Sequence, residues 1–210
     1  MRDPAQPRPD WLALAGLVLT IVLNFVLQAR GPNPYFMAGA CVFWAAFVVV
    51  RARQHPGIIR AWGFRADNLA RASVLPALLF VIIAAAFAVY AHFKGHLRFP
   101  LHQLGLFLLY PVWGFIQQFL ALGIVVNNLE RIDGLEQRPA LVTLIAAVLF
   151  GAVHADDLRL AAGTFALELV LVPLYLRDRN LWPLGVLHGW VGGLFYLWVL
   201  NRDLWLENFG

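Results

Sequence analysis

Apolar stretches of the sequence contain the ionisable side chains of Glu168, His154 and His188, and a residue of this kind inside such a stretch indicates a functional site. Glu168 lies about halfway along the run GTFALELVLVPLYL. Its carboxyl group must either be protonated or face a cation, a metal or a polar cavity, because hydrocarbon does not solvate a carboxylate. His154 and His188 lie in two other apolar runs, and a neutral imidazole can act as a general base or as a metal ligand. Together these residues could supply acid–base chemistry.

Two adjacent glutamines, Gln117 and Gln118, lie in an apolar stretch with no charged residue and no histidine between positions 104 and 126. Successive residues of a helix point about 100° apart, so one amide is expected to face a pocket while the other bonds to a neighbouring helix. Alternatively, both amides serve only as hydrogen-bonding groups between helices. In either case they need partners, because an unpaired amide in hydrocarbon is unfavourable.

The two histidines occur in short patterns that predict how their side chains are oriented. Phe150 and His154 are four residues apart and share a helix face. Near the end of its run, His154 could instead be an interfacial hydrogen-bonding residue. His188 lies in LWPLGVLHGWVGG, where glycines recur every four residues, a spacing that lets another helix approach closely. His188 falls with Gly185, Gly189 and Gly192 in an arc of about 100°, so we expect it to point inward.

The composition indicates an integral membrane protein. Of 210 residues, 61% are hydrophobic and 13% are charged, and the mean hydropathy is +0.70. A soluble chain of this length could not bury so much apolar surface. No polar linker divides the chain, so we predict one integral membrane domain over residues 1–210. The single cysteine, Cys41, excludes an internal disulfide and a cysteine-based zinc site, and no basic run with interleaved aromatics indicates nucleic-acid binding.

Seven apolar runs predict an all-α bundle of about seven transmembrane helices. They cover residues 11–29, 36–50, 74–92, 104–126, 140–157, 160–176 and 182–200. Several approach the roughly 20 residues that a helix needs to cross a bilayer. With alternating loops, eleven of the sixteen Lys and Arg residues fall on one side, which predicts a cytoplasmic N-terminus. The larger group includes Arg2 and Arg8, and the smaller one includes Arg30.

The order and spacing of these residues resemble those of the CAAX-protease/bacteriocin-processing (CPBP or Abi) family of intramembrane peptidases. That family carries Glu-Glu-x-x-x-Arg-Gly, Phe-x-x-x-His and His-x-x-x-Asn motifs on three helices. Here QQFLALG stands at the first motif, FGAVH at the second and HGWVG at the third. The stretches WGFRADNL and GTFALELVLVPLYLRDRNLWPLGVLHG also look similar, so the resemblance covers residues 60–200. It implies a CAAX-protease-like core within the helical bundle.

Several motif positions depart from the family pattern. Gln117 and Gln118 stand at the two glutamates, Leu122 at the arginine and Gly192 at the asparagine. An amide has negligible basicity, so the glutamines cannot do the work of a carboxylate. The first explanation is a degenerate, inactive member whose cavity still binds a membrane peptide or a partner. The second is that Glu168, at a position often small in the family, supplies the charge that Gln117 lacks.

The resemblance also implies roles for the positions that match. In the family, the second-motif histidine helps to activate water and the last histidine stabilises the oxyanion, which assigns these roles to His154 and His188. A divalent metal held by His154, His188 and a carboxylate would be a three-ligand set with an open position, although we expect no cofactor. A small proton-coupled transporter is a further alternative, but the sequence has no evident internal repeat.

We therefore predict an intramembrane endopeptidase of the CPBP family, which hydrolyses a peptide bond in or near the membrane. The candidate catalytic residues are His154, His188, Glu168, Gln117 and Gln118, and the candidate substrate-binding residues are Phe150 and Gly192. The expected partners are membrane lipids and a peptide or membrane-protein substrate, with no nucleic acid. The expected location is the bacterial inner (cytoplasmic) membrane.

Overall fold

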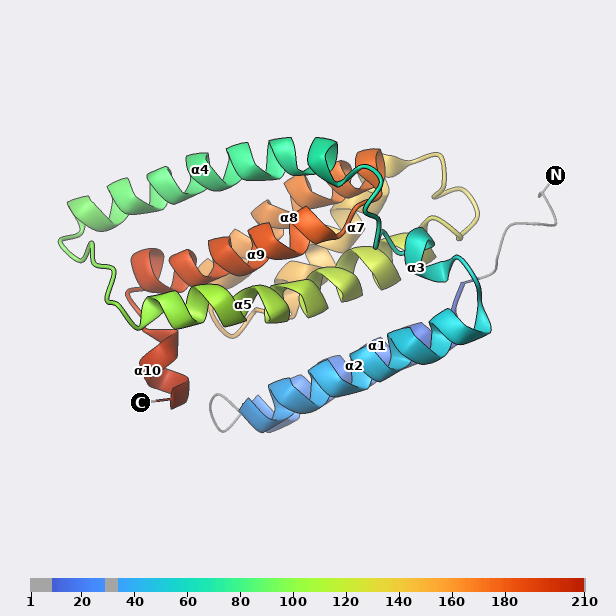
Figure 1. Ribbon diagram of the computed structural model, residues 1–210, viewed down its shortest axis with the longest axis horizontal. Helices are drawn as coiled ribbons and strands as arrows, with labels where there is room; N and C mark the ends of the chain where they lie inside the picture. The colour runs from blue at the N-terminus through green and yellow to red at the C-terminus, as the bar shows by residue number, and fades with distance from the viewer. Residues whose placement is uncertain (1–8, 29–33, 210) are drawn as a thin grey trace.

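The computed structural model describes residues 9–28 and 34–209, and within these ranges it contains helices and no strands. In chain order the elements are α1 (Trp11–Gln28), α2 (Pro34–Gln54), α3 (Ile58–Ala61), α4 (Leu69–Phe93), α5 (Gln103–Gln118), the π-helix η1 (Phe119–Val126), α6 (Asn127–Leu129), α7 (Pro139–Ala152), α8 (Leu158–Asp178), α9 (Trp182–Leu194), the π-helix η2 (Phe195–Val199) and α10 (Leu204–Phe209). Helices α1 and α2 lie side by side along one flank of the bundle and α4 along the opposite flank, with α5, α7, α8 and α9 between them (Figure 1).

The predicted all-α membrane fold is confirmed. Every predicted apolar run contains a helix, and four segments are long and apolar enough to cross a membrane. These segments are Tyr35–Gln54, Leu69–Phe93, Gln103–Leu129 and Leu158–Asp178. The apolar helices at Trp11–Leu27 and Pro139–Ala152 are shorter, so the count of seven spans stays a prediction.

Polar contacts join the loops at each end of the bundle. At one end, the Nδ2 of Asn180 donates to the Oδ1 of Asn68 at 2.8 Å, and Arg179 forms an ion pair with Glu130. These bonds hold the turn from which α9 starts. At the other end, His102 pairs with the Asp203 carboxylate at 2.8 Å.

Which end faces the cytoplasm stays a prediction. The alternation of the described helices agrees with the expected grouping of basic loops, since the residues after α2, α6 and α8 meet at the same end. Arg2, Arg8 and Arg30, which also entered that prediction, lie outside the described residues.

Helices α5 and α9 touch backbone to backbone. A Cβ atom added to Gly114 would lie 2.6 Å from the backbone nitrogen of Gly189, and one added to Gly189 would lie 2.5 Å from the Cα of Pro111. At Gly185 an added Cβ would lie 2.7 Å from a side-chain atom of α5. The close approach predicted from the glycine repeat is thus confirmed at positions 185 and 189, while at Gly193 the nearest atom is an ordinary 3.8 Å away.

Replacing Gly189 by alanine is expected to destabilise the protein. The new methyl group would meet the backbone of α5, which cannot move aside as a flexible side chain can. We expect a loss of about 1–3 kcal/mol in the free energy of unfolding, typical of an overpacked interior. Thermal unfolding in detergent micelles measures it. The control is Gly39→Ala on α2, where an added Cβ meets nothing within 4 Å; equal melting temperatures for the two variants would contradict the close contact.

Candidate functional site

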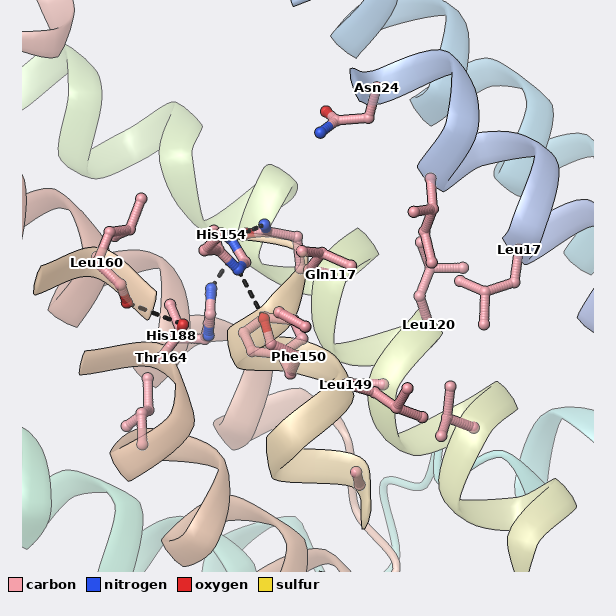
Figure 2. A pocket seen from close by; sticks show the side chains of 18 of the residues that line it. Leu17, Asn24, Gln117, Leu120, Leu149, Phe150, His154, Leu160, Thr164 and His188 are labelled. Carbon is pink, nitrogen blue, oxygen red and sulfur yellow. Dashed lines mark hydrogen bonds between the residues drawn. The ribbon is translucent and has the colours of Figure 1, made fainter. Parts of the chain in front are cut away.

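A cavity of about 920 Å³ opens between α1 and the helices α5, α7, α8 and α9. Most of its lining is apolar and includes Leu17 of α1, Leu120 of η1 and Leu149 of α7. Figure 2 shows the side chains of Gln117, His154 and His188 gathered at one wall, while α1 faces them across the cavity. The cavity therefore combines a mostly apolar lining with a wall on which a glutamine and two histidines gather.

The structure brings the five candidate catalytic residues together from four parts of the chain. Gln117 and Gln118 form the last turn of α5, Glu168 lies on α8 and His188 on α9. His154 lies in the turn that follows α7, since that helix ends at Ala152. The predicted run over residues 140–157 is thus longer than the helix, and His154 is presented by a turn.

Hydrogen bonds link these five residues into one chain. The Nε2 of Gln118 donates to the Oε1 of Glu168 at 2.6 Å and lies 3.0 Å from the Nδ1 of His188. The Nε2 of His188 lies 3.0 Å from the Oε1 of Gln117, whose Nε2 lies 3.4 Å from the Nε2 of His154. The two amides, which were expected to need partners inside the membrane, thus have them on other parts of the chain.

The donors and acceptors of this chain determine which nitrogen of each histidine carries the proton. An amide nitrogen only donates, so the Nδ1 of His188 accepts from Gln118 and the Nε2 of His188 donates to Gln117. The Nδ1 of His154 lies 2.8 Å from the carbonyl oxygen of Phe150, which only accepts. His154 therefore carries its proton on Nδ1, and the lone pair of its Nε2 points toward Gln117. Both imidazoles are neutral.

Phe150 packs between the two histidines. Its ring centroid lies 5.0 Å from that of His154 and 5.4 Å from that of His188, where the rings meet edge to face. The ring is 8% exposed and also lines the cavity. Phe150 thus restricts the orientation of both imidazoles.

Gly192, the other candidate for substrate binding, lines the same cavity. A Cβ atom at this position would lie 3.1 Å from the ring of Tyr110, which is also part of the lining. Tyr110 thus occupies the space into which a side chain at position 192 would extend. Leu122, at the arginine position of the first motif, has no exposed surface and lies in the hydrophobic core.

The placement of Glu168 corrects the hypothesis that it supplies a carboxylate to the reaction in place of Gln117. Its side chain has no exposed surface and does not line the cavity, so water in the cavity cannot contact it. The carboxyl group instead lies behind the polar wall and bonds to Gln118. The helix rotation that points Gln117 into the cavity points Gln118 away from it, toward α8, as their offset of about 100° requires.

The donor set does not fit a metal ion. Among the described residues, no group of three or more His, Cys, Asp or Glu is placed to hold one. Both ring nitrogens of His188 are already bonded to amides, and Gln117 lies between the two imidazoles. No step is therefore assigned to a metal.

Asp156 is the carboxylate on the cavity side that sequence reasoning did not select. It lines the cavity, is exposed, and interacts electrostatically with His154 two residues earlier. In the sequence it follows an apolar run and reads as an ordinary loop residue. Its proximity to a candidate histidine was the signal that could have identified it.

Removing the amide of Gln118 is expected to destabilise the protein. The Gln118→Met variant would leave the Oε1 of Glu168 and the Nδ1 of His188 without their donor. Because Gln118 has no exposed surface, solvent water cannot take the place of that donor. Each unsatisfied buried group typically costs about 1–3 kcal/mol, so thermal unfolding should begin at a lower temperature. Leu122→Met, one turn further along and equally buried, is the control and should change stability little. An equal effect of both substitutions would mean that the amide contributes only volume.

Comparison with known proteins gives a family for the segment that carries the site. Residues 99–194 match the family model described as Type II CAAX prenyl endopeptidase Rce1-like. The match spans α5 to α9 and includes all the candidate residues, but is shorter than the 60–200 expected from the motifs. No curated protein and no solved structure matches the chain. The chain is an integral membrane protein whose resemblance to the CAAX-protease/bacteriocin-processing family is confirmed over residues 99–194.

Proposed function

We propose that the protein is an intramembrane endopeptidase that hydrolyses a peptide bond beside an apolar segment held in the cavity. The observation that carries this proposal is the polar wall formed by Gln117, His154 and His188 within a cavity whose lining is mostly apolar. An apolar substrate segment would be bound by the hydrocarbon lining, and its peptide bond would meet the wall on which the Gln117 amide and the two imidazoles offer proton donors and acceptors.

His154 is the group best suited to act as the base. Its proton lies on Nδ1, bonded to the carbonyl oxygen of Phe150, so the Nε2 lone pair is available on the cavity side. The contact between this nitrogen and the amide of Gln117 is long, at 3.4 Å, and a water molecule can take its place. The negative charge of Asp156 nearby would stabilise the protonated imidazole.

The reaction then follows the usual course of peptide hydrolysis. Water attacks the carbonyl carbon while His154 takes its proton, and the C–N bond breaks as His154 returns that proton to the departing amine. The N–H groups of Gln117 and His188 are the donors available to the oxyanion on this wall. The products are a carboxylic acid and an amine.

A second candidate function is peptide binding without hydrolysis. It is favoured by the absence of a carboxylate from the polar wall itself, where amides stand at the positions of both family glutamates and Glu168 is buried behind them. In that case the cavity would hold a membrane peptide, and no bond would be broken.

Peptide cleavage by the purified protein distinguishes the two functions. The name of the matched family suggests a C-terminal peptide carrying a prenyl group as the first substrate, assayed in lipid nanodiscs beside the unprenylated peptide, with products read by mass spectrometry. We expect His154→Gln to lower the cleavage rate by about 100-fold or more, the contribution typical of a general base. His92→Gln, at an exposed histidine of α4, is the control and should cleave at the wild-type rate.

Binding is measured in the same preparations with a fluorescent form of the prenylated peptide. Wild-type protein that binds this peptide but leaves it intact would support the binding function and overturn hydrolysis. Cleavage that survives His154→Gln unchanged would exclude His154 as the base.

A further inference from the structure

Two buried oxygen atoms behind the polar wall lack a hydrogen-bond partner, and they belong to the same pair of side chains. They are the Oε1 of Gln118 and the Oε2 of Glu168. The other two polar atoms of these groups already share a bond, since the Nε2 of Gln118 donates to the Oε1 of Glu168 at 2.6 Å. Neither side chain has any exposed surface, so water in the cavity does not reach them. Buried polar atoms without partners are uncommon and call for an explanation.

We propose that Glu168 is a neutral carboxylic acid that donates its proton from Oε2 to the Oε1 of Gln118. A carboxylic acid and a primary amide are complementary, because each planar group offers one donor and one acceptor side by side. With the proton on Oε2, the two groups form a ring with two hydrogen bonds, and both unpartnered oxygens acquire a partner. Without that proton both oxygens are acceptors only, so they cannot form a hydrogen bond with each other.

The surroundings of Glu168 also favour the neutral acid. An ionised carboxylate without exposed surface needs a cation or several donors. Within the described part of the chain, Glu168 forms no ion pair, and its hydrogen-bond donor is the single amide of Gln118. A neutral acid needs neither a cation nor several donors. Its Oε1 accepts from Gln118, and its own proton can be donated to the Oε1 of Gln118.

The ring makes Glu168 and Gln118 positioning residues for His188. It fixes which end of the Gln118 amide is nitrogen, with one N–H directed to Glu168 and the other to the Nδ1 of His188. The proton of His188 must then lie on Nε2, where it is directed to Gln117 at the cavity. A reversed amide would place an oxygen against Nδ1 and would move that proton to the wrong side of the ring. This positioning role rests on the proposed function, whereas the protonation of Glu168 does not.

Infrared spectroscopy of the full-length protein in lipid bilayers at neutral pH tests the protonation. We expect the difference between wild type and Glu168→Gln to show the loss of a protonated carboxylic-acid C=O band. The matched control is Glu207→Gln, because Glu207 is paired with Arg202 at 2.7 Å and should lose carboxylate bands instead. Labelling the wild-type protein with ¹³C-glutamate should shift the same acid band, and this measurement needs no substitution. Loss of carboxylate bands in Glu168→Gln, or no shifted acid band in the labelled protein, would overturn the proposal.

Nitrogen-15 NMR of the histidine rings tests the positioning. In the wild type we expect the proton of His188 on Nε2. Glu168→Gln should keep it there, because an amide at position 168 can form the same two bonds with Gln118, whereas Glu168→Leu should give a mixture of the two ring forms. If proton placement is the same in Glu168→Leu as in the wild type, the positioning role is excluded.

Activity gives a third measurement with a distinct signature. Glu168→Gln should retain cleavage close to the wild-type rate, whereas Glu168→Leu should lower it by about 10-fold or more, as when the group that orients a catalytic histidine is removed. Loss of cleavage in Glu168→Gln with His188 still protonated on Nε2 would contradict the neutral acid. The infrared and NMR spectra are recorded without substrate. They therefore test the protonation of Glu168 and the proton position on His188 even if the protein cleaves no peptide.

Discussion

The site depends on the contact between the backbones of α5 and α9. Gly114 and Gly189 have no side chains at this contact, so the two helices lie close enough for the amides of α5 to bond to His188 on α9. Hydrogen bonds of about 3.0 Å weaken steeply as the atoms separate. One methyl group between the helices would therefore disturb both the packing and the polar network. The hydrogen bonds of the candidate site thus depend on the glycine contact.

Hydrocarbon imposes a second constraint, which explains the glutamine pair. Inside the membrane a polar side chain must find its partners within the protein. An amide donates and accepts, and so does a neutral imidazole, so alternating amides and imidazoles form a continuous uncharged chain from Glu168 to the carbonyl oxygen of Phe150. Two carboxylates at positions 117 and 118 would only accept, and they would need added protons or cations. The glutamines thus form a neutral network at the positions where the first motif of the similar family carries two carboxylates.

The five polar residues divide into two layers with different exposure. Gln117 and His154 line the cavity together with the largely buried His188, whereas Gln118 and Glu168 are fully buried behind them. Only the first layer can meet a substrate. The second layer acts through His188, which connects the two. A buried carboxyl group in a membrane helix is therefore compatible with a role in orientation, and its presence alone does not identify a base.

The sequence alone determined the membrane setting, the helical fold and the resemblance to a peptidase family, because hydropathy, glycine spacing and motif order are properties of the chain itself. It also brought the right residues under consideration: Gln117, Gln118, His154, Glu168 and His188 do meet. The rotation of each helix, however, depends on how its neighbours pack. Only the tertiary structure decided that Gln117 faces the cavity and Gln118 faces α8, that Glu168 lies behind the wall, and that the loop residue Asp156 reaches the cavity. Rotating α5 by about 100° about its axis would exchange the directions of Gln117 and Gln118. The residues around them are apolar on every face of the helix, so the sequence has no hydrophobic periodicity that would predict this rotation.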